Sequence, residues 1–276
     1  MDVLQIIVLV GVFLLGVATG GLSNITSGGA GVFTIFLLAR FENMSIQEAV
    51  GTVLAASTIF VLGGAITFYR RKQVDSQLSL TLGLAGVGGS YFAATLASSL
   101  QSTLLERSLG LFTVFVAIYT LAQSVRLRRR NIGSFSEYLQ QDGTKERAEV
   151  SRWTSRDPLA IIAQLAFGTS IGVVTGLFGV AGAGLTMAAL LFVFKLRAGM
   201  VLGTSLTASF FRYAGGSVGY LATGLINPTV FLILSAGGIL GSVFGARFVT
   251  GRSRRSYVQI VIVGLLLLTG IEFLIR

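Results

Sequence analysis

The sequence contains no cysteine and no histidine. Without cysteine there is no disulfide, no thiolate nucleophile and no thiolate metal site, and without histidine the commonest catalytic base and metal ligand is missing. Charged residues are also scarce, at 12% of the chain against about 25% in soluble domains. These shortages argue against an enzyme, and we expect neither a metal nor another cofactor.

Carboxylates are missing from the middle of the long apolar runs. Glu48 and Asp75 fall near the starts of apolar segments, and Glu106 and Glu272 fall near the face opposite the basic loops. Proton relays and cation cages usually need Asp, Glu or His at membrane depth. The sequence therefore argues against a metal-cation transporter, and it offers no obvious proton-coupling residue.

Apolar residues are abundant instead, at 53% with a mean hydropathy of +0.81, and glycine occurs 36 times. Several apolar runs reach the roughly 20 residues that a membrane-spanning helix needs. The pattern predicts an all-α integral membrane protein with ten segments, at 3–22, 29–41, 46–69, 77–99, 105–125, 158–178, 184–195, 199–222, 228–249 and 256–275. A polar linker, 127–157, separates a first transmembrane repeat (1–126) from a second (158–276).

The two halves share an ordered set of residues at a constant offset of 152. The matches in the third segment of each half are Gly51, Thr52, Leu54, Ala56, Ser57, Gly63 and Gly64 with Gly203, Thr204, Leu206, Ala208, Ser209, Gly215 and Gly216. Further matches follow in the next segment, such as Gly86 with Gly238 and Ser90 with Ser242. This order predicts an internal duplication.

The basic residues predict the orientation. With the linker in the cytoplasm, 17 of the 21 Lys and Arg residues fall inside, three fall outside, and Arg212 lies within the membrane. An excess of basic residues in cytoplasmic loops is the usual rule, so it explains the net charge of +10 better than nucleic-acid binding does. Five crossings per half place both termini outside and invert one repeat relative to the other, as in many secondary transporters.

The segments 29–41 and 184–195 are short, and each follows a loop of small residues. We interpret them as broken helices, because non-helical backbone at membrane depth is tolerated where protein or a water-filled cavity satisfies it. The N-terminus of the following helix would then offer free N–H groups to an anion. Candidate ligand residues in these loops are Asn24, Thr26, Ser27, Gly28, Gly29, Gly31, Gly182 and Gly184.

Arg212 is the basic residue that we place at membrane depth, where a charge is costly and usually functional. Ser205, Ser209 and Arg212 share one helix face at i, i+4 and i+7. Hydroxyls beside a guanidinium suit an oxyanion. Further hydroxyl candidates are Thr52, Ser57 and Thr204. The alternatives are that Arg212 caps a broken helix or pairs with helix carbonyls, and that the hydroxyls join helices.

Three stretches resemble the sulfite exporter TauE/SafE family, whose second half typically reads GLFGVGGG and then AVGTSL. Here GLFGVAGAG occupies 176–184, VLGTSL occupies 201–206 and YLATGLIN occupies 220–227. The first half adds a related loop and the boundary YRRKQVD at 69–75. The resemblance implies export of small sulfur oxyanions or organosulfonates across a prokaryotic plasma membrane.

We therefore expect a transporter that exports a small anion by alternating access, with a central site between the two broken loops. The alternatives are an anion channel, a transporter of a small carboxylate, and a non-transporting membrane scaffold. The expected partners are a small anionic substrate and the lipid bilayer, and we expect no nucleic acid. A homo-oligomer is compatible with these expectations.

Overall fold

The structure is a computed structural model that describes residues 3–26, 29–42, 44–129, 158–179, 182–196, 198–248 and 254–275, and the regular secondary structure of these residues is helical. The first half contains α1 (Val3–Thr26), α2 (Gly29–Phe41), α3 (Ile46–Arg70), α4 (Ser76–Ser99) and α5 (Ser102–Arg129). The second half contains α7 (Pro158–Phe178), α8 (Gly182–Phe192), α9 (Ala198–Ala222), α10 (Pro228–Phe248) and α11 (Arg254–Ile275). These ten helices match the ten segments expected from hydropathy.

Local sequence explains where several helices begin. The Ser45 side chain accepts from the backbone N–H of Glu48, and Asp75 does the same for Leu78, so both act as N-caps. The two prolines, Pro158 and Pro228, open α7 and α10, the position at which a missing N–H costs least. The polar turns between apolar runs therefore fix the starts of these helices.

The end of α1 differs from the expectation. The first broken loop was expected to include Asn24 and Thr26, but α1 continues through Thr26. Neither glycine nor proline occurs between Leu22 and Ser27, so no residue in this stretch strongly disfavours a helix. Residues 27 and 28 lie outside the described residues. As expected, α2 and α8 are short, with 13 and 11 residues.

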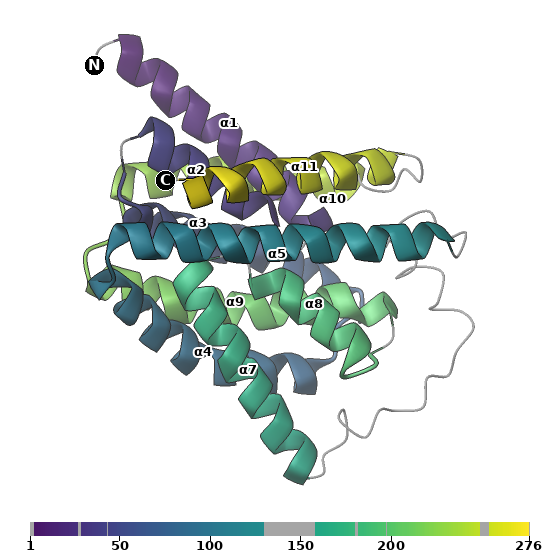
Figure 1. Cartoon of the computed structure of the whole chain (residues 1–276). Coiled ribbons are helices and arrows are strands. Elements are labelled where there is room, and N and C mark those ends of the chain that lie inside the picture. The colour runs from purple at the N-terminus through teal and green to yellow at the C-terminus, as the bar shows by residue number, and fades with distance from the viewer. Residues whose placement is uncertain are drawn as a thin grey trace.

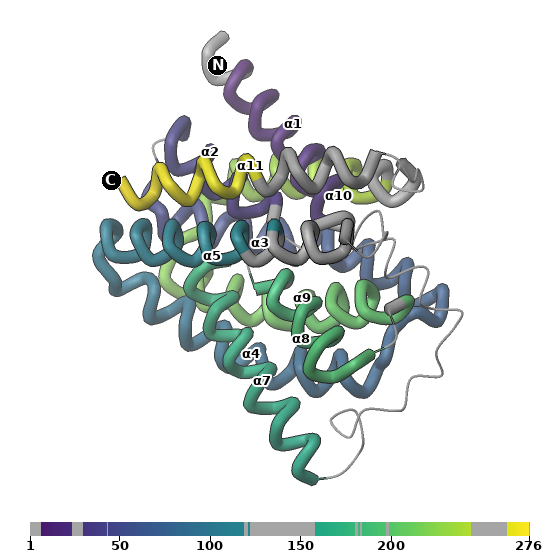
Figure 2. Tube along the Cα trace, turned by 45° about the vertical axis from the view of Figure 1, so that its right-hand side comes forward, coloured from purple at the N-terminus to yellow at the C-terminus, as the bar shows by residue number. Residues whose placement is uncertain are grey.

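The helices of the two halves interleave rather than form separate bundles. α4 packs along α7, α1 packs along α10, and α3 packs along α9 between these pairs. α5 and α11 lie side by side across one face (Figures 1 and 2). In Figure 1 the start of α1 projects at the top of the molecule and the start of α7 projects at the bottom.

Contacts within this arrangement recur at the offset of 152. The backbone N–H of Asp75 donates to Thr204 at 2.9 Å, and that of Asn227 donates to Thr52 at 3.0 Å. The turns that precede α4 and α10 also match, because Lys72 and Gly224 both have positive φ angles, of 57° and 71°. At these positions, residues with equal places in the two halves therefore make equal contacts across the halves.

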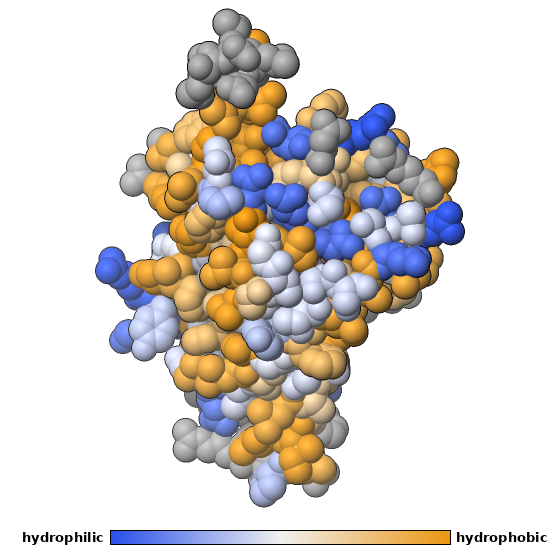
Figure 3. All heavy atoms as spheres, turned by 90° about the vertical axis from the view of Figure 1, so that its left-hand side faces the viewer, coloured by the Kyte–Doolittle hydropathy of each residue, from blue (hydrophilic) through white to orange (hydrophobic). Residues whose placement is uncertain are grey.

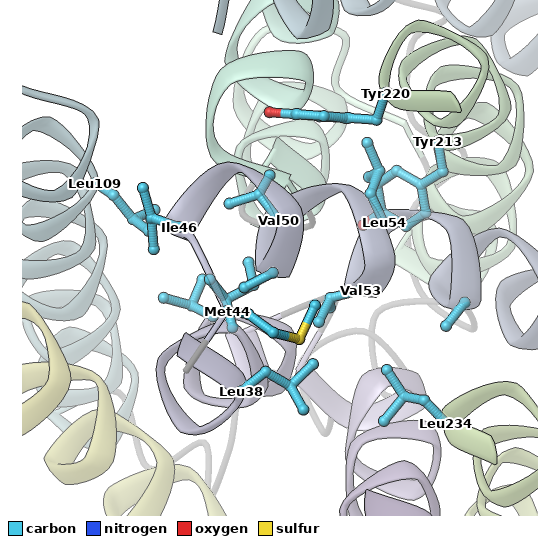
Figure 4. Packing of buried hydrophobic residues seen from close by; sticks show 14 of the residues in the cluster. Leu38, Met44, Ile46, Val50, Val53, Leu54, Leu109, Tyr213, Tyr220 and Leu234 are labelled. Carbon is cyan, nitrogen blue, oxygen red and sulfur yellow. The ribbon is translucent and has the colours of Figure 1, made fainter. Parts of the chain in front are cut away.

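Apolar side chains fill the interior and also cover the outside. Figure 4 shows Val50, Val53 and Leu54 of α3 packed among side chains from α2, α9 and α10. On the outside, Phe92, Phe115 and Leu232 are each more than 60% exposed. Figure 3 shows hydrophobic residues (orange) over much of one face, with hydrophilic residues (blue) gathered mostly in its upper half. Exposed apolar side chains of this size suit contact with lipid.

Three of the described helices, α3, α4 and α7, are long and apolar enough to cross a membrane. Shorter apolar stretches lie in α1, α2, α10 and α11. Together with the apolar outer surface, these helices support the expectation of an all-helical membrane protein.

Candidate functional site

Arg212 lies in the middle of α9, 14 residues after its first residue, Ala198, or about 21 Å along the helix. Its side chain is 0% exposed. The aliphatic part of the side chain crosses Gly86 of α4, where an added Cβ would lie 2.5 Å from Arg212 Cδ and 2.9 Å from the carbonyl oxygen of Gly168. A residue other than glycine at position 86 would therefore displace Arg212.

The guanidinium is held by hydroxyl groups from two helices. Its NH2 atom donates to Thr186 Oγ1 of α8 at 2.6 Å and to Ser209 Oγ of α9 at 2.9 Å. Thr186 in turn donates to the carbonyl oxygen of Gly182, the first residue of α8, at 3.0 Å. We call Arg212, Thr186, Ser209 and Gly86 the Arg212 cluster. The cluster connects the arginine to the glycine-rich start of α8.

Part of the guanidinium has no acceptor in the described structure. Arg212 Nε and NH1 lack hydrogen-bond partners there, and so does the hydroxyl of Ser205, one helical turn before Ser209. A guanidinium carries five N–H donors, and the two on NH2 are engaged, so three remain. A buried charged donor without an acceptor is costly, and an anion bearing several oxygens would satisfy it.

The contacts also bear on the structural alternative for Arg212. Within the described residues, the guanidinium donates to hydroxyls and not to helix carbonyls. The backbone of the same residue is fixed separately, because Ser90 of α4 donates to the Arg212 carbonyl oxygen at 2.6 Å. The helix and the hydroxyl frame are thus held by bonds that do not use the three remaining donors.

The glycine-rich segments are described only in part. Ser27 and Gly28 lie outside the described residues, as do the side chains of Asn24 and Thr26. Of the predicted glycines, Gly29 begins α2 and Gly31 is buried in the same helix. Their contribution to a site stays a prediction.

The two predicted glycines of α8 differ in their surroundings. A Cβ at Gly182 would overlap the hydroxyl of Thr175, whereas a Cβ at Gly184 would meet nothing within 4 Å. Close packing against α7 therefore requires glycine at position 182 but not at position 184.

Three predicted hydroxyl residues make no hydrogen bond to the Arg212 cluster within the described structure. Thr52 and Thr204 accept from backbone N–H groups that precede α10 and α4, so their oxygens already join the two halves. Ser57 is buried in α3, at the position that matches Ser209, and its hydroxyl has no partner in the described structure. A substrate-binding role for these three stays a prediction.

The sequence alone did not identify Thr186 or Gly86 as members of the cluster. Both come from helices other than α9, so the helix periodicity that groups Ser205, Ser209 and Arg212 cannot detect them. One signal was available for Thr186, because Thr34 occupies the matching position in the other short segment at the same offset of 152.

Comparison with known proteins agrees with the membrane architecture. A family model described as sulfite exporter TauE/SafE matches residues 12–273. In Bacillus subtilis (strain 168), the probable membrane transporter protein YdhB is 29% identical over 245 residues, covering 88% of this chain and 89% of its own. The probable membrane transporter protein YjnA, from the same organism, is 24% identical and covers 96% of this chain and 99% of its own.

No solved structure matches the chain. The family match nevertheless spans all ten described helices in whole or in part, including the Arg212 cluster. The names of the relatives indicate membrane transport. The chain belongs to the sulfite exporter TauE/SafE family.

Proposed function

We propose that the protein carries a small anion across the membrane and that Arg212 binds it. The observation that carries this proposal is a fully buried guanidinium whose three remaining N–H donors find no acceptor among the described residues. Oxygen atoms of a sulfur oxyanion or organosulfonate would accept from these donors through charge-assisted hydrogen bonds. Ser205, whose hydroxyl has no partner in the part of the chain that the structure describes, lies on the same helix face and would add a further bond.

Burial of Arg212 favours a carrier over an open channel. A residue that is 0% exposed is reached by a hydrated anion only after helices move apart. We propose that the halves are an inverted duplication and that alternating access exposes the site first to one side and then to the other. An inside-negative potential drives an anion outward by about 2.3 kcal/mol per charge per 100 mV, so export needs no coupling ion.

A thermal-shift screen of the purified protein tests the proposal. The panel would contain sulfite, sulfate, thiosulfate, taurine, sulfoacetate and acetate, and the same panel would be run on Arg212→Met. A ligand that binds the folded state raises the melting temperature with concentration. We expect one or more of the sulfur anions to stabilise the wild-type protein and not the variant. Equal responses of both proteins, or none, would count against an anion site at Arg212.

The proposed orientation makes a separate prediction about surface labelling. The chain has no cysteine, so labelling of a single cysteine introduced at Gln101 or at Lys72 reports the accessibility of that position alone. Both residues are exposed and lie between helices. In intact cells, Gln101→Cys is expected to react with an impermeant thiol reagent, and Lys72→Cys only after the cells are opened. The reverse pattern would mean that the linker side faces outward.

A further inference from the structure

The environment of Arg212 has a counterpart in the first half, around Phe60. The two residue numbers differ by 152, as do those of Gly86 and Gly238. Phe60 of α3 lies across Gly238 of α10, where an added Cβ would be 2.9 Å from Phe60 Cε1. Arg212 of α9 lies across Gly86 of α4 in the same manner. A glycine of the opposite half thus accommodates each side chain.

The hydroxyl groups around the two positions correspond as well. Ser57 precedes Phe60 by three residues, as Ser209 precedes Arg212. In the short helices, Thr34 matches Thr186, and each donates to the carbonyl four residues earlier, at 3.2 and 3.0 Å. All four hydroxyl residues are at most 1% exposed. We call Phe60, Thr34, Ser57 and Gly238 the Phe60 cluster.

The hydrogen bonds of the two clusters differ. Ser209 receives a hydrogen bond from the guanidinium, whereas the hydroxyl of Ser57 has no partner in the described structure. Thr34 bonds instead to Thr19 of α1. Phe60 carries no donor that could replace the guanidinium. A buried hydroxyl without a partner is unfavourable, so packing alone does not account for serine at position 57.

We propose that the first half retains the hydroxyl frame of a second anion-binding site, and that Phe60 occupies the place of the guanidinium and so excludes anions. The ligand class is the small oxyanion that binds at Arg212, and this inference rests on the proposed function. The transporter is then asymmetric, because the two similar hydroxyl frames differ in charge: one contains Arg212 and the other contains Phe60.

Phe60→Arg tests this inference, with Phe60→Met as the matched uncharged control. Sulfite binding would be measured by calorimetric titration of the wild-type protein, of Phe60→Arg, of Arg212→Met and of the double variant. We expect Phe60→Arg to bind two sulfite ions per folded chain instead of one. We expect Arg212→Met to bind at least tenfold more weakly, and the double variant to recover most of that loss.

A second measurement needs no ligand. If the introduced guanidinium bonds to Ser57, then Ser57→Ala lowers the melting temperature in the Phe60→Arg background but not in the wild-type background. Failure of Phe60→Arg to fold, while Phe60→Met folds, would overturn the inference, because a guanidinium would then have no frame to enter. Equal effects of Ser57→Ala in both backgrounds would overturn it too.

The outcomes distinguish the inference from the proposed function. If Arg212→Met binds sulfite as the wild-type protein does, the proposed function fails for this anion, and the melting-temperature comparison still decides whether the frame exists. If Arg212→Met loses binding and the double variant does not regain it, the proposed function stands and the second site is rejected.

Discussion

Replacing Arg212 by methionine is expected to weaken anion binding by about ten- to over a hundredfold. The reason is that a hydrogen bond to a charged group contributes roughly 1.5–3 kcal/mol, and tenfold in affinity corresponds to about 1.4 kcal/mol. Methionine keeps a long apolar side chain across Gly86 but offers no donor. Arg107→Met is the matched control, because Arg107 is exposed on α5 and should leave affinity unchanged.

Arg212→Lys is expected to give an intermediate loss. Two of the bonds made by the guanidinium go to Thr186 and Ser209, and an ammonium has three donors in total. If lysine keeps both hydroxyl bonds, one donor remains for the anion where arginine leaves three. Lysine should therefore bind more weakly than the wild-type protein but more strongly than methionine.

A structural role for Arg212 predicts a different pair of results. Arg212→Met would then lower the melting temperature and leave the affinity of each folded molecule intact. Measuring both quantities on the same purified variants separates the two roles. Reduced stability with unchanged affinity would remove Arg212 from the site.

The second large effect is expected from a pair of adjacent glycines in α4. A Cβ at Gly89 would lie 2.5 Å from the carbonyl oxygen of Thr169 in α7, whereas one at Gly88 would meet nothing within 4 Å. Overpacking costs typically 1–3 kcal/mol, and we expect Gly89→Leu to reach the upper end because the contacting atoms belong to the α7 backbone. Gly88→Leu, on the exposed side of the helix, should have little effect.

Melting temperatures and the fraction of monodisperse protein after solubilisation would measure this difference. α4 is also the helix that Arg212 crosses at Gly86, so Gly89→Leu should reduce anion binding together with stability. Equal stability of the two leucine variants would mean that α4 and α7 do not pack as closely as described.

The helices could be predicted from the sequence because apolar runs mark them locally; the caps and prolines at their starts became evident in the structure. The clearest error was at the end of α1, where small polar residues suggested a loop and the chain continues as a helix to Thr26. Composition alone could not place the end of α1, because the same small polar residues are compatible with a helix end and with a loop.

The site could be predicted only as far as one helix extends. Periodicity grouped Ser209 with Arg212, and the structure joins them at 2.9 Å. Thr186 approaches from α8, which no pattern within α9 indicates. The recurrence of Thr52 and Thr204 suggested substrate contact, yet their oxygens accept from backbone N–H groups of the opposite half. A repeated residue can maintain a repeated junction as well as a site.

Anion efflux from proteoliposomes tests the central claim most directly. Vesicles containing the wild-type protein, Arg212→Met or Arg107→Met would be loaded with sulfite, and release would be followed under an inside-negative potential set by a potassium gradient and valinomycin. We predict that vesicles with the wild-type protein or Arg107→Met release sulfite faster as the potential grows. Vesicles with folded Arg212→Met should release it no faster than sulfite-loaded vesicles that contain no protein. Equal release by Arg212→Met and the wild-type protein would contradict transport through the Arg212 cluster.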